Sequence, residues 1–306
     1  MRKLVLLLLV FLHPSFSENI PSLYFTPNPK TDKIIISLME GAESSIYIAG
    51  YSVSWGKMIE LLNREKWNNI DIKILTDRET KWILKDIVRI YDKPGLFHPK
   101  FIVVDKKYVL IGSGNFTDDG IYLHHNHFLL IKDRNIADFL NKKFLSWWDD
   151  KPAEEPEVYE DEIYQIYFSP ETNCESIIIQ NISNARKSIH FLHYQFTSEE
   201  IAKVIIRKKL SGVDVYGILE PLNIEPYSVF YPLIDYGCRL KKSNRAGFLH
   251  DKLFIIDEEI VITGSYNPTA SARKNTECLL IIKDKETAKK FLKEWKKLWL
   301  FYSVKP

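Results

Sequence analysis

Cysteine is scarce in this 306-residue sequence, which contains only Cys174, Cys238 and Cys278. Their spacing is not that of a metal site, and an odd number leaves at least one thiol unpaired within the chain. Cys174 and Cys238 could form a disulfide in an oxidising compartment, but we expect buried free thiols because cysteine is among the most buried residue types. Disulfides and cysteine-bound metals are therefore not expected to organise the fold.

Long hydrophobic runs are also scarce, and the one that exists is too short to span a bilayer. Residues 4–12 form an unbroken apolar run of nine residues, against the roughly 20 that a transmembrane helix needs. Arg2 and Lys3 precede this run, and the small-residue stretch Ser15-Phe16-Ser17 follows it. This order is typical of a secretory signal peptide, so we expect residues 1–17 to be removed and the protein to be exported, to the periplasm or out of the cell.

The sequence has little net charge. Its 42 Lys and Arg residues and 40 Asp and Glu residues give +2, and loss of residues 1–17 would lower this to 0. Proteins that bind nucleic acid mainly by neutralising phosphates usually carry a basic excess, which is absent here. A local basic rim is still compatible with the sequence, and its candidate members are Lys241, Lys242, Arg245, Arg273 and Lys274.

What the sequence does contain is an internal duplication. The segment LYFTP at residues 23–27 returns as IYFSP at residues 166–170, 143 positions later, and the offset grows to 152 in the second part of each copy. Repetition over this length indicates two copies of one structural unit. We expect the first unit at residues 18–148 and the second at residues 163–306, joined by an acidic linker at residues 149–162.

Hydrophobic periodicity predicts alternating helices and strands in each copy. Helical spacing appears at residues 30–40 and 55–63, and strand-like runs at 45–49 and 70–76. The second copy repeats this order, with helices expected at residues 176–185 and 199–210 and strands at 188–192 and 213–219. The alternation predicts an α/β fold in which each copy has a mostly parallel mixed β-sheet flanked by helices.

Both copies carry the same polar pattern, H-x-K-x4-D-x6-G-S-x-N. Six residue types recur at fixed offsets, which coincidence explains poorly. They are His98, Lys100, Asp105, Gly112, Ser113 and Asn115 in the first copy and His250, Lys252, Asp257, Gly264, Ser265 and Asn267 in the second. We expect the histidine and lysine of each motif on one strand, where residues two positions apart face the same side.

The two motifs together suit phosphodiester chemistry. One neutral histidine can attack phosphorus while the other, protonated, delivers a proton to the leaving alcohol. Lys100 and Lys252 can neutralise the phosphate oxygens, to which Asn115 and Asn267 can donate hydrogen bonds. Two serines can add hydroxyl donors or only complete the turn after the strand, and they are Ser113 and Ser265.

The pair of motifs resembles the HKD motifs of the phospholipase D superfamily of phosphodiesterases. The resemblance implies one active site between the two copies, a covalent phosphohistidine, and no metal or other cofactor. It also favours His98 as the nucleophile and His250 as the general acid. Asp105 and Asp257 belong to the motif and count among its catalytic residues. Their place at the head of a turn nevertheless suggests a structural role, bonding backbone amides two residues further on.

The superfamily often has a carboxylate after the G-S-x-N segment that hydrogen-bonds a catalytic histidine, and Glu277 matches that position. The first copy has no acid there, because residues 124–127 read HHNH. We expect Glu277 to lie beside His250, to raise its pKa and to keep it protonated. The three histidines His124, His125 and His127 are expected to be solvated or to pack, and not to bind a metal.

The resemblance determines the reaction better than the substrate. Export and a net charge of 0 favour the headgroup bond of a phospholipid, which would yield an alcohol and phosphatidic acid. The alternatives are a secreted nonspecific nuclease, a phosphatidyl transferase that uses the same residues, and a non-enzymatic binding protein for phosphorylated ligands. We expect a monomer, because both motifs lie in one chain.

Overall fold

The structure is a computed structural model that describes residues 20–152, 157–224, 228–244 and 246–302. The expected signal peptide, residues 1–17, and Arg245 lie outside these ranges. None of the helices within them combines the length and the apolar character that crossing a bilayer requires. Cys174, Cys238 and Cys278 are all buried free thiols, as predicted.

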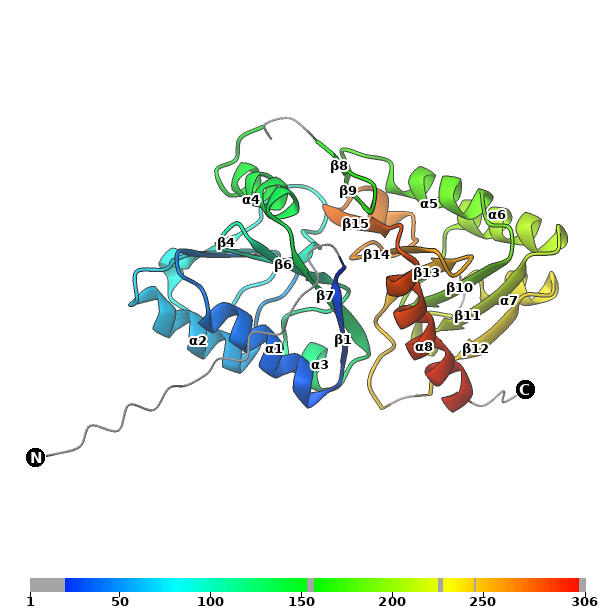
Figure 1. The fold of residues 1–306 in the computed structure, drawn as a ribbon, viewed down its shortest axis with the longest axis horizontal. Coiled ribbons are helices and arrows are strands. Elements are labelled where there is room, and N and C mark those ends of the chain that lie inside the picture. The colour runs from blue at the N-terminus through cyan, green and yellow to red at the C-terminus, as the bar shows by residue number, and fades with distance from the viewer. Residues whose placement is uncertain (1–19, 153–156, 225–227, 245, 303–306) are drawn as a thin grey trace, which may run out of the picture.

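The first copy forms a seven-stranded sheet with the order β1-β7-β6-β5-β2-β3-β4 (Figure 1). Its strands are β1 (Ser22–Thr26), β2 (Ser45–Gly50), β3 (Asp71–Thr76), β4 (Val88–Ile90), β5 (Lys100–Val104), β6 (Tyr108–Gly112) and β7 (Asn126–Lys132). Its helices are α1 (Pro29–Glu40), α2 (Gly56–Lys66), α3 (Asp118–Tyr122) and α4 (Arg134–Trp148), with a 3-10 turn η1 (Lys85–Ile87).

The second copy repeats this plan in an eight-stranded sheet with the order β12-β11-β10-β13-β14-β15-β9-β8. Its strands are β8 (Tyr159–Glu160), β9 (Tyr164–Ser169), β10 (Ser188–His193), β11 (Asp214–Leu219), β12 (Arg239–Lys242), β13 (Lys252–Ile256), β14 (Ile260–Gly264) and β15 (Glu277–Ile282). Its helices are α5 (Cys174–Ser183), α6 (Glu199–Leu210), α7 (Phe230–Asp235) and α8 (Lys285–Phe301), with 3-10 turns η2 (Pro221–Asn223) and η3 (Ser271–Arg273).

The tandem α/β architecture and the mixed sheets are confirmed, but parallel pairing does not predominate. Only β2-β3-β4 and β10-β11-β12 run parallel, and every other neighbouring pair is antiparallel. Parallel strands need a crossover connection, whereas the motif strands are joined by tight hairpins. The helix–strand alternation on which the prediction rested covers only the first half of each copy.

The expected acidic linker contains a strand. Residues 159 and 160 of β8 pair with β9, so the second sheet begins within the stretch 149–162. Sequence reasoning missed this strand because it has only two residues and lies among acids.

One apolar core joins the two copies. Helices α1 and α2 cover the outer face of the first sheet, and α5 and α6 cover that of the second (Figure 1). The inner faces of both sheets pack with α4 and α8 in a third cluster to which both copies contribute, including Phe101, Phe144, Leu253 and Phe291. Because burying apolar surface is the main favourable contribution to folding, this shared core fixes the two motifs relative to each other.

Candidate active site

Each motif lies on a β-hairpin whose turn is built around its aspartate. Asp105 and Asp257 have φ values of 54° and 55°, in the left-handed region that tight hairpin turns require. The Asp105 carboxylate accepts hydrogen bonds from the backbone N–H groups of Glu43, Ser44 and Ser45, at 2.8–2.9 Å. The Asp257 carboxylate accepts three equivalent bonds just before β10, from Arg186, Lys187 and Ser188.

Asp105 and Asp257 are therefore structural, and counting them as catalytic was wrong. Neither lies on the wall of the cavity described next. Their partners also differ from the amides two residues on that the turn suggested. Each aspartate ties its hairpin to the loop before a neighbouring strand, some 60 to 71 residues earlier in the chain.

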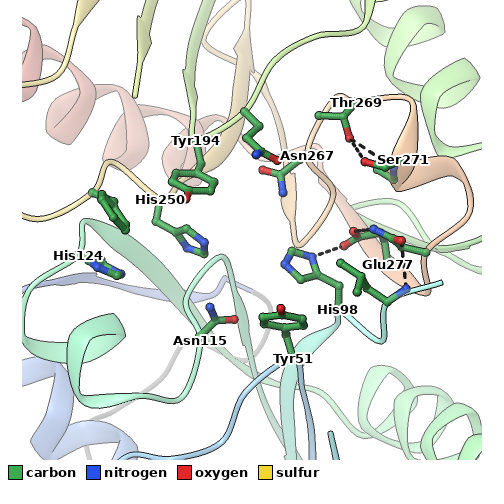
Figure 2. Close-up of a pocket in the computed structure, with 15 residues that line it drawn as sticks. Tyr51, His98, Asn115, His124, Tyr194, His250, Asn267, Thr269, Ser271 and Glu277 are labelled. Atoms are coloured by element: carbon green, nitrogen blue, oxygen red, sulfur yellow. Dashed lines mark hydrogen bonds and ion pairs between the residues drawn. The ribbon is translucent and has the colours of Figure 1, made fainter. Parts of the chain in front are cut away.

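A cavity of about 330 Å³ lies between the two copies, and both motif histidines line it (Figure 2). The imidazole rings of His98 and His250 face this space from opposite copies. The remaining lining residues are Tyr51, Leu96, Asn115, His124, Tyr194, Gln195, Phe248, Asn267, Thr269, Ser271, Ala272, Asn275 and Glu277. The expectation of one site between two copies is met by this geometry.

The backbone before each motif is bound by the opposite copy. The His98 N–H donates to the carbonyl of Thr276 and the His250 N–H donates to that of His125, both at 2.9 Å. Two isolated β-bridges between the copies accompany these bonds, one joining Phe97 to Thr276 and the other joining Leu249 to His125. Each motif thus depends on the other copy for its position.

Two acids at equivalent positions reinforce this arrangement. Asp77 accepts a hydrogen bond from the N–H of Phe97, and Glu220 accepts one from the N–H of Leu249, both at 2.8 Å. Each acid directly follows its strand, β3 or β11, and holds the residue before a motif histidine. The sequence repeat aligned Asp77 with Glu220, but it did not predict the hydrogen bonds that these acids accept from the backbone.

Glu277 contacts His98, and not His250 as predicted. Its Oε2 lies 2.7 Å from Nδ1 of His98 and accepts a second hydrogen bond from Ser265 at 2.5 Å. The prediction failed because it assumed that each copy supports its own histidine, whereas the motif segments cross. Burial would raise the pKa of Glu277, but His98 and Lys100 outweigh it, so the net shift is downward. The carboxylate is ionised beside His98.

Asn126 occupies the position equivalent to Glu277, at the start of β7, and contacts His250. Its Oδ1 lies 2.9 Å from Nδ1 of His250, and its amide nitrogen donates to the carbonyl of Gly120 at 3.0 Å. Because the Asn126 amide nitrogen is bound to the Gly120 carbonyl, the amide oxygen faces His250 and accepts a hydrogen bond from its Nδ1–H. Sequence reasoning missed Asn126, although LLIKD at 129–133 and LIIKD at 280–284 align these strands at an offset of 151.

The two histidines therefore have different electrostatic partners. Burial lowers the pKa of His98, and the charge of Glu277 partly opposes this shift. Burial, followed by Lys252 and Lys100, holds the pKa of His250 well below its usual value. The expected rise in the pKa of His250 is not found, because its neighbour is a neutral amide and its other neighbours are cations.

Both motif lysines are buried behind the histidines. The Nζ atoms of Lys100 and Lys252 donate to the backbone carbonyl of their own motif histidine at 2.7 Å, and Lys252 Nζ also lies 3.2 Å from Nε2 of His250. Burial lowers the pKa of Lys100 to about 7 and that of Lys252 well below its usual value. The site thus crowds cationic groups together and favours an anion.

The asparagines and serines of the motifs have different surroundings. Asn115 and Asn267 line the cavity, as expected for phosphate-binding residues. Ser113 and Ser265 are fully buried, do not line the cavity, and contact Asn126 and Glu277 respectively. Direct phosphate binding was the wrong role for the serines, which position the partners of the histidines.

The glycine of each motif allows two strands to approach closely. A Cβ at Gly112 would lie 2.0 Å from the carbonyl oxygen of His127, and one at Gly264 would lie 2.3 Å from that of Cys278. These carbonyls also accept hydrogen bonds from the N–H groups of Ser113 and Ser265. Only glycine fits, and the approach places each serine against the partner of a motif histidine.

Comparison with known proteins agrees with the paired geometry. A family model described as cardiolipin synthase, PLD-like domain, matches residues 35–148 and again residues 178–299. The chain belongs to the phospholipase D superfamily. The two matched segments correspond to the two copies and contain both motifs.

The chain is also similar to individual proteins of known sequence and known structure. A phospholipase D of Rickettsia prowazekii is 32% identical over 130 residues, covering 42% of this chain and 63% of that protein. A mitochondrial cardiolipin hydrolase of Mus musculus is 28% identical over 129 residues, covering 40% of this chain and 57% of that protein. A phosphatidylserine synthase from Haemophilus influenzae superposes with a TM-score of 0.69 at 14% identity, over 92% of this chain and 88% of that one, which shows a common fold.

The three clustered histidines of this superfamily member have separate environments. His124 lines the cavity and stacks on Phe248 at 4.6 Å. His125 and His127 are buried, as the packing interpretation expected, and their Nδ1 atoms lie 2.5 Å and 2.8 Å from the carboxylate of Asp251. Asp251 is the middle residue of the second motif. No group of His, Cys, Asp and Glu side chains in the described part of the chain is arranged to hold a metal ion.

Most candidates for a basic rim have other partners. Lys241 donates to the carbonyls of Trp299 and Tyr302 at the end of α8, at 2.6 Å and 2.7 Å. Lys242 donates to the hydroxyl of Tyr231, and Arg273 pairs with Glu175. Arg245 lies outside the described residues, and Lys274 is exposed. The structure therefore offers less support for a phosphate-tracking rim than the sequence suggested.

Proposed function

We propose that this protein is an exported phosphodiesterase that hydrolyses the headgroup bond of phospholipids through a covalent phosphohistidine. The observation that carries the proposal is the pair of histidines facing one cavity with different Nδ1 partners, Glu277 for His98 and Asn126 for His250. A carboxylate and an amide at equivalent positions give the two imidazoles different roles in one reaction.

In the first step, His98 acts as the nucleophile. Its Nδ1–H donates to Glu277, which leaves the lone pair of Nε2 free and stabilises the positive charge that develops on attack. The Nε2–phosphorus bond forms while the bond from phosphorus to the headgroup oxygen breaks. His250 gives its Nε2 proton to that oxygen, so the headgroup leaves as an alcohol and not as an alkoxide.

In the second step, water releases the phosphate. His250, now neutral, takes a proton from the water, whose oxygen bonds to phosphorus while the bond to His98 Nε2 breaks. The products are phosphatidic acid and the original histidine pair. The same residue serves as acid and then as base, which requires an imidazole that titrates within the operating pH range.

Substrate binding would prepare His250 for the acid role. In the empty site, burial and the two lysines lower the pKa of His250. A phosphodiester anion among these groups compensates their charge and raises the pKa values of His250, Lys100 and Lys252 together. The lysines and the amides of Asn115 and Asn267 then stabilise the charge on the non-bridging oxygens in the transition state.

The choice of phospholipid over nucleic acid is supported by charge. The mature chain would have a net charge of 0, and Lys241, Lys242 and Arg273 have other partners in the structure. A nucleic acid bound without sequence preference would need a cationic path along its backbone. A phospholipid headgroup needs only the phosphate site and a small pocket beside it.

The deciding experiment supplies the purified chain with two substrates in parallel, in EDTA. One reaction contains phosphatidylcholine vesicles and the other contains single-stranded DNA. Choline release with intact DNA is the expected result, whereas DNA cleavage without choline release would establish the nuclease alternative. Product analysis without an added alcohol separates hydrolysis from transfer, because a hydrolase forms phosphatidic acid with water alone whereas a transferase needs a second alcohol as acceptor.

A further inference from the structure

The two copies end in equivalent helices, α4 and α8, whose exposed faces differ (Figure 1). The exposed residues of α4 are Arg134, Asn135 and Lys142, and Lys142 pairs with Asp138 at 2.9 Å. The exposed residues of α8 are mostly lysines, and they are Lys285, Glu286, Lys289, Lys290, Lys293, Lys296, Lys297, Leu300 and Phe301. Both helices pack in the shared core. The second copy therefore has a basic helical surface that the first copy lacks.

Half of the lysines of α8 are not compensated by a carboxylate. Three of the six form ion pairs with glutamates, and they are Lys285, Lys289 and Lys297. Lys290, Lys293 and Lys296 form no ion pair within the described part of the chain. With its six lysines and two glutamates α8 has a charge of +4, whereas the whole chain has +2, so the remainder has −2. An anionic surface would therefore orient the molecule with α8 toward it.

Two apolar side chains lie exposed at the carboxyl end of this basic face. Leu300 is 83% exposed and Phe301 is 68% exposed. Residues three or four positions apart lie on one side of a helix, so Leu300 and Phe301 continue the side that carries Lys293 and Lys296. The opposite side of α8, which includes Trp295, is buried in the shared core. Only the basic side with its apolar end is therefore open to a partner.

The carboxyl end of α8 lies at the cavity end of the second sheet. Strand β10 ends at His193, directly before the cavity-lining residue Tyr194. Strands β10, β11 and β12 run parallel, so β12 ends on the same side. There Lys241 donates to two carbonyls at the end of α8, which holds that end beside β12. A surface that contacts the end of α8 thus meets the molecule at its cavity end.

We propose that the exposed face of α8 docks the protein on anionic phospholipid bilayers. Lys290, Lys293 and Lys296 lie against the lipid phosphates, while Leu300 and Phe301 enter the region between the headgroups and the acyl chains. This inference rests on the proposed phospholipid hydrolysis and deepens it, because it assigns the surface that brings the cavity to its substrate.

The apolar end of the face favours a bilayer over a nucleic acid. Proteins that bind single strands without sequence preference combine cations with aromatic side chains on which the bases stack. Among the exposed residues of α8, Phe301 is the one aromatic ring, and Leu300 beside it has none. A bilayer suits both parts of the face, because its surface is anionic and the region below its headgroups is apolar.

The test measures binding to vesicles of two compositions, phosphatidylcholine alone and an equimolar mixture with phosphatidylglycerol. The chain carries His98→Ala in these assays, so that the lipid is not consumed. Co-sedimentation should show binding to the mixed vesicles that weakens as salt is added. A triple variant, Lys290→Gln with Lys293→Gln and Lys296→Gln, should bind them about 100-fold less tightly. We call it the α8 variant.

The matched control removes the same charge from the first copy. Lys30, Lys33 and Lys85 are exposed and form no ion pair in the described ranges, so their replacement by Gln should leave binding nearly unchanged. Leu300→Ser with Phe301→Ser should weaken binding several-fold even at high salt, because salt does not screen apolar contact. Equal losses in the two lysine variants, or no binding to the mixed vesicles, would overturn the docking face.

Turnover assays without His98→Ala separate this inference from the proposed function. On a short-chain phosphatidylcholine below its critical micelle concentration, the α8 variant should match the unmodified chain, while its hydrolysis of mixed vesicles should fall. Equal rates on vesicles would overturn the docking role. No hydrolysis by the unmodified chain, with vesicle binding retained, would overturn the proposed function alone. Weaker binding of single-stranded DNA by the α8 variant, with vesicle binding unaffected, would assign the face to nucleic acid instead.

Discussion

The motif segments of the two copies contact each other at two places, which have equivalent backbone hydrogen bonds but differ in charge. We call the positions Pro99, Thr276 and Cys278 the proline seam and the equivalent positions Asp251, His125 and His127 the aspartate seam. The proline seam has no ionised side chain among these three, whereas the aspartate seam buries a carboxylate with two imidazoles. Duplication preserved the main-chain bonds at both seams, and the side chains diverged.

The aspartate seam is a buried ion cluster. The two ring nitrogens of His125 lie 2.5 Å from Asp251 and 3.3 Å from Glu294, so both donate and the ring is an imidazolium. Burial would raise the pKa of Asp251, but His125 and His127 reverse this and hold it far below its usual range. One seam therefore relies on charge compensation and the other does not.

The same divergence underlies the roles that we propose for the two motif histidines. Glu277 and Asn126 hold equivalent positions, and each contacts the motif histidine of the other copy. A carboxylate suits the nucleophile because it holds the tautomer with a free Nε2. A neutral amide suits an acid that must release its proton. The asymmetry of the chemistry thus comes from one pair of positions in an otherwise repeated site.

The largest expected effect separates the two histidines. His98→Ala should lower kcat by about 10⁴-fold or more and abolish the phosphoenzyme, because no other nucleophile is placed at phosphorus. His250→Ala should still form it with a p-nitrophenyl phosphodiester, whose leaving group needs no proton. Rapid quenching of reactions with a ³²P-labelled substrate measures the amount of phosphoenzyme in each variant. Labelling that persists in His98→Ala would contradict the assignment.

Removing the charge of Asp251 from the aspartate seam should strongly lower the free energy of unfolding. Asp251→Asn leaves the buried imidazolium of His125 uncompensated on one side, and breaking a buried pair in this way costs about 3–5 kcal/mol. Urea denaturation measures the change. The control is Asp138→Asn, an exposed partner of Lys142 on α4, which should cost at most about 0.5 kcal/mol. Similar losses in the two variants would show that the seam is not held by charge.

Replacing the Nδ1 partners of the two motif histidines, Asn126 and Glu277, should alter kcat and its dependence on pH. Asn126→Asp places a carboxylate beside His250, which favours the protonated ring and raises its pKa. The acid then stays protonated to higher pH, so the alkaline limb of kcat should move upward. Glu277→Gln should lower kcat by about 10²-fold through loss of the tautomer-holding charge. An unchanged alkaline limb in Asn126→Asp would argue against His250 as the acid.

The smallest expected effect is proton uptake on anion binding. The pKa of Lys100 is lowered to about 7 by burial, so at pH 8 most of the free protein has a neutral Lys100. A bound tungstate ion would raise the pKa values of Lys100, Lys252 and His250 together, so the site should take up protons on binding at pH 8. Calorimetry in buffers of different ionisation enthalpy measures the number. Lys100→Met should reduce that number, and a binding enthalpy that does not depend on the buffer at pH 8 would contradict the lowered pKa of Lys100.

The duplication, the tandem α/β units, the motif pairs and the superfamily could all be predicted from the sequence. These follow from spacing and periodicity, which local chain geometry dictates. Asp105 and Asp257 were correctly placed at turns from their sequence neighbours alone, while the amides that they bind lie in distant loops. The extent of antiparallel pairing was not predictable from the helix–strand alternation, because it depends on which strands become neighbours in the sheet.

Which side chain contacts which motif histidine could not be predicted from the sequence. Sequence reasoning assigned Glu277 to its own copy, but the motif segments cross, so it binds His98, and Asn126 binds His250. The cluster around Asp251 is likewise a result of crossing, because His125 and His127 come from the other copy. The physical reason is that sequence periodicity reports which face of an element is buried, whereas contacts between copies depend on how two complete sheets pack through their shared core.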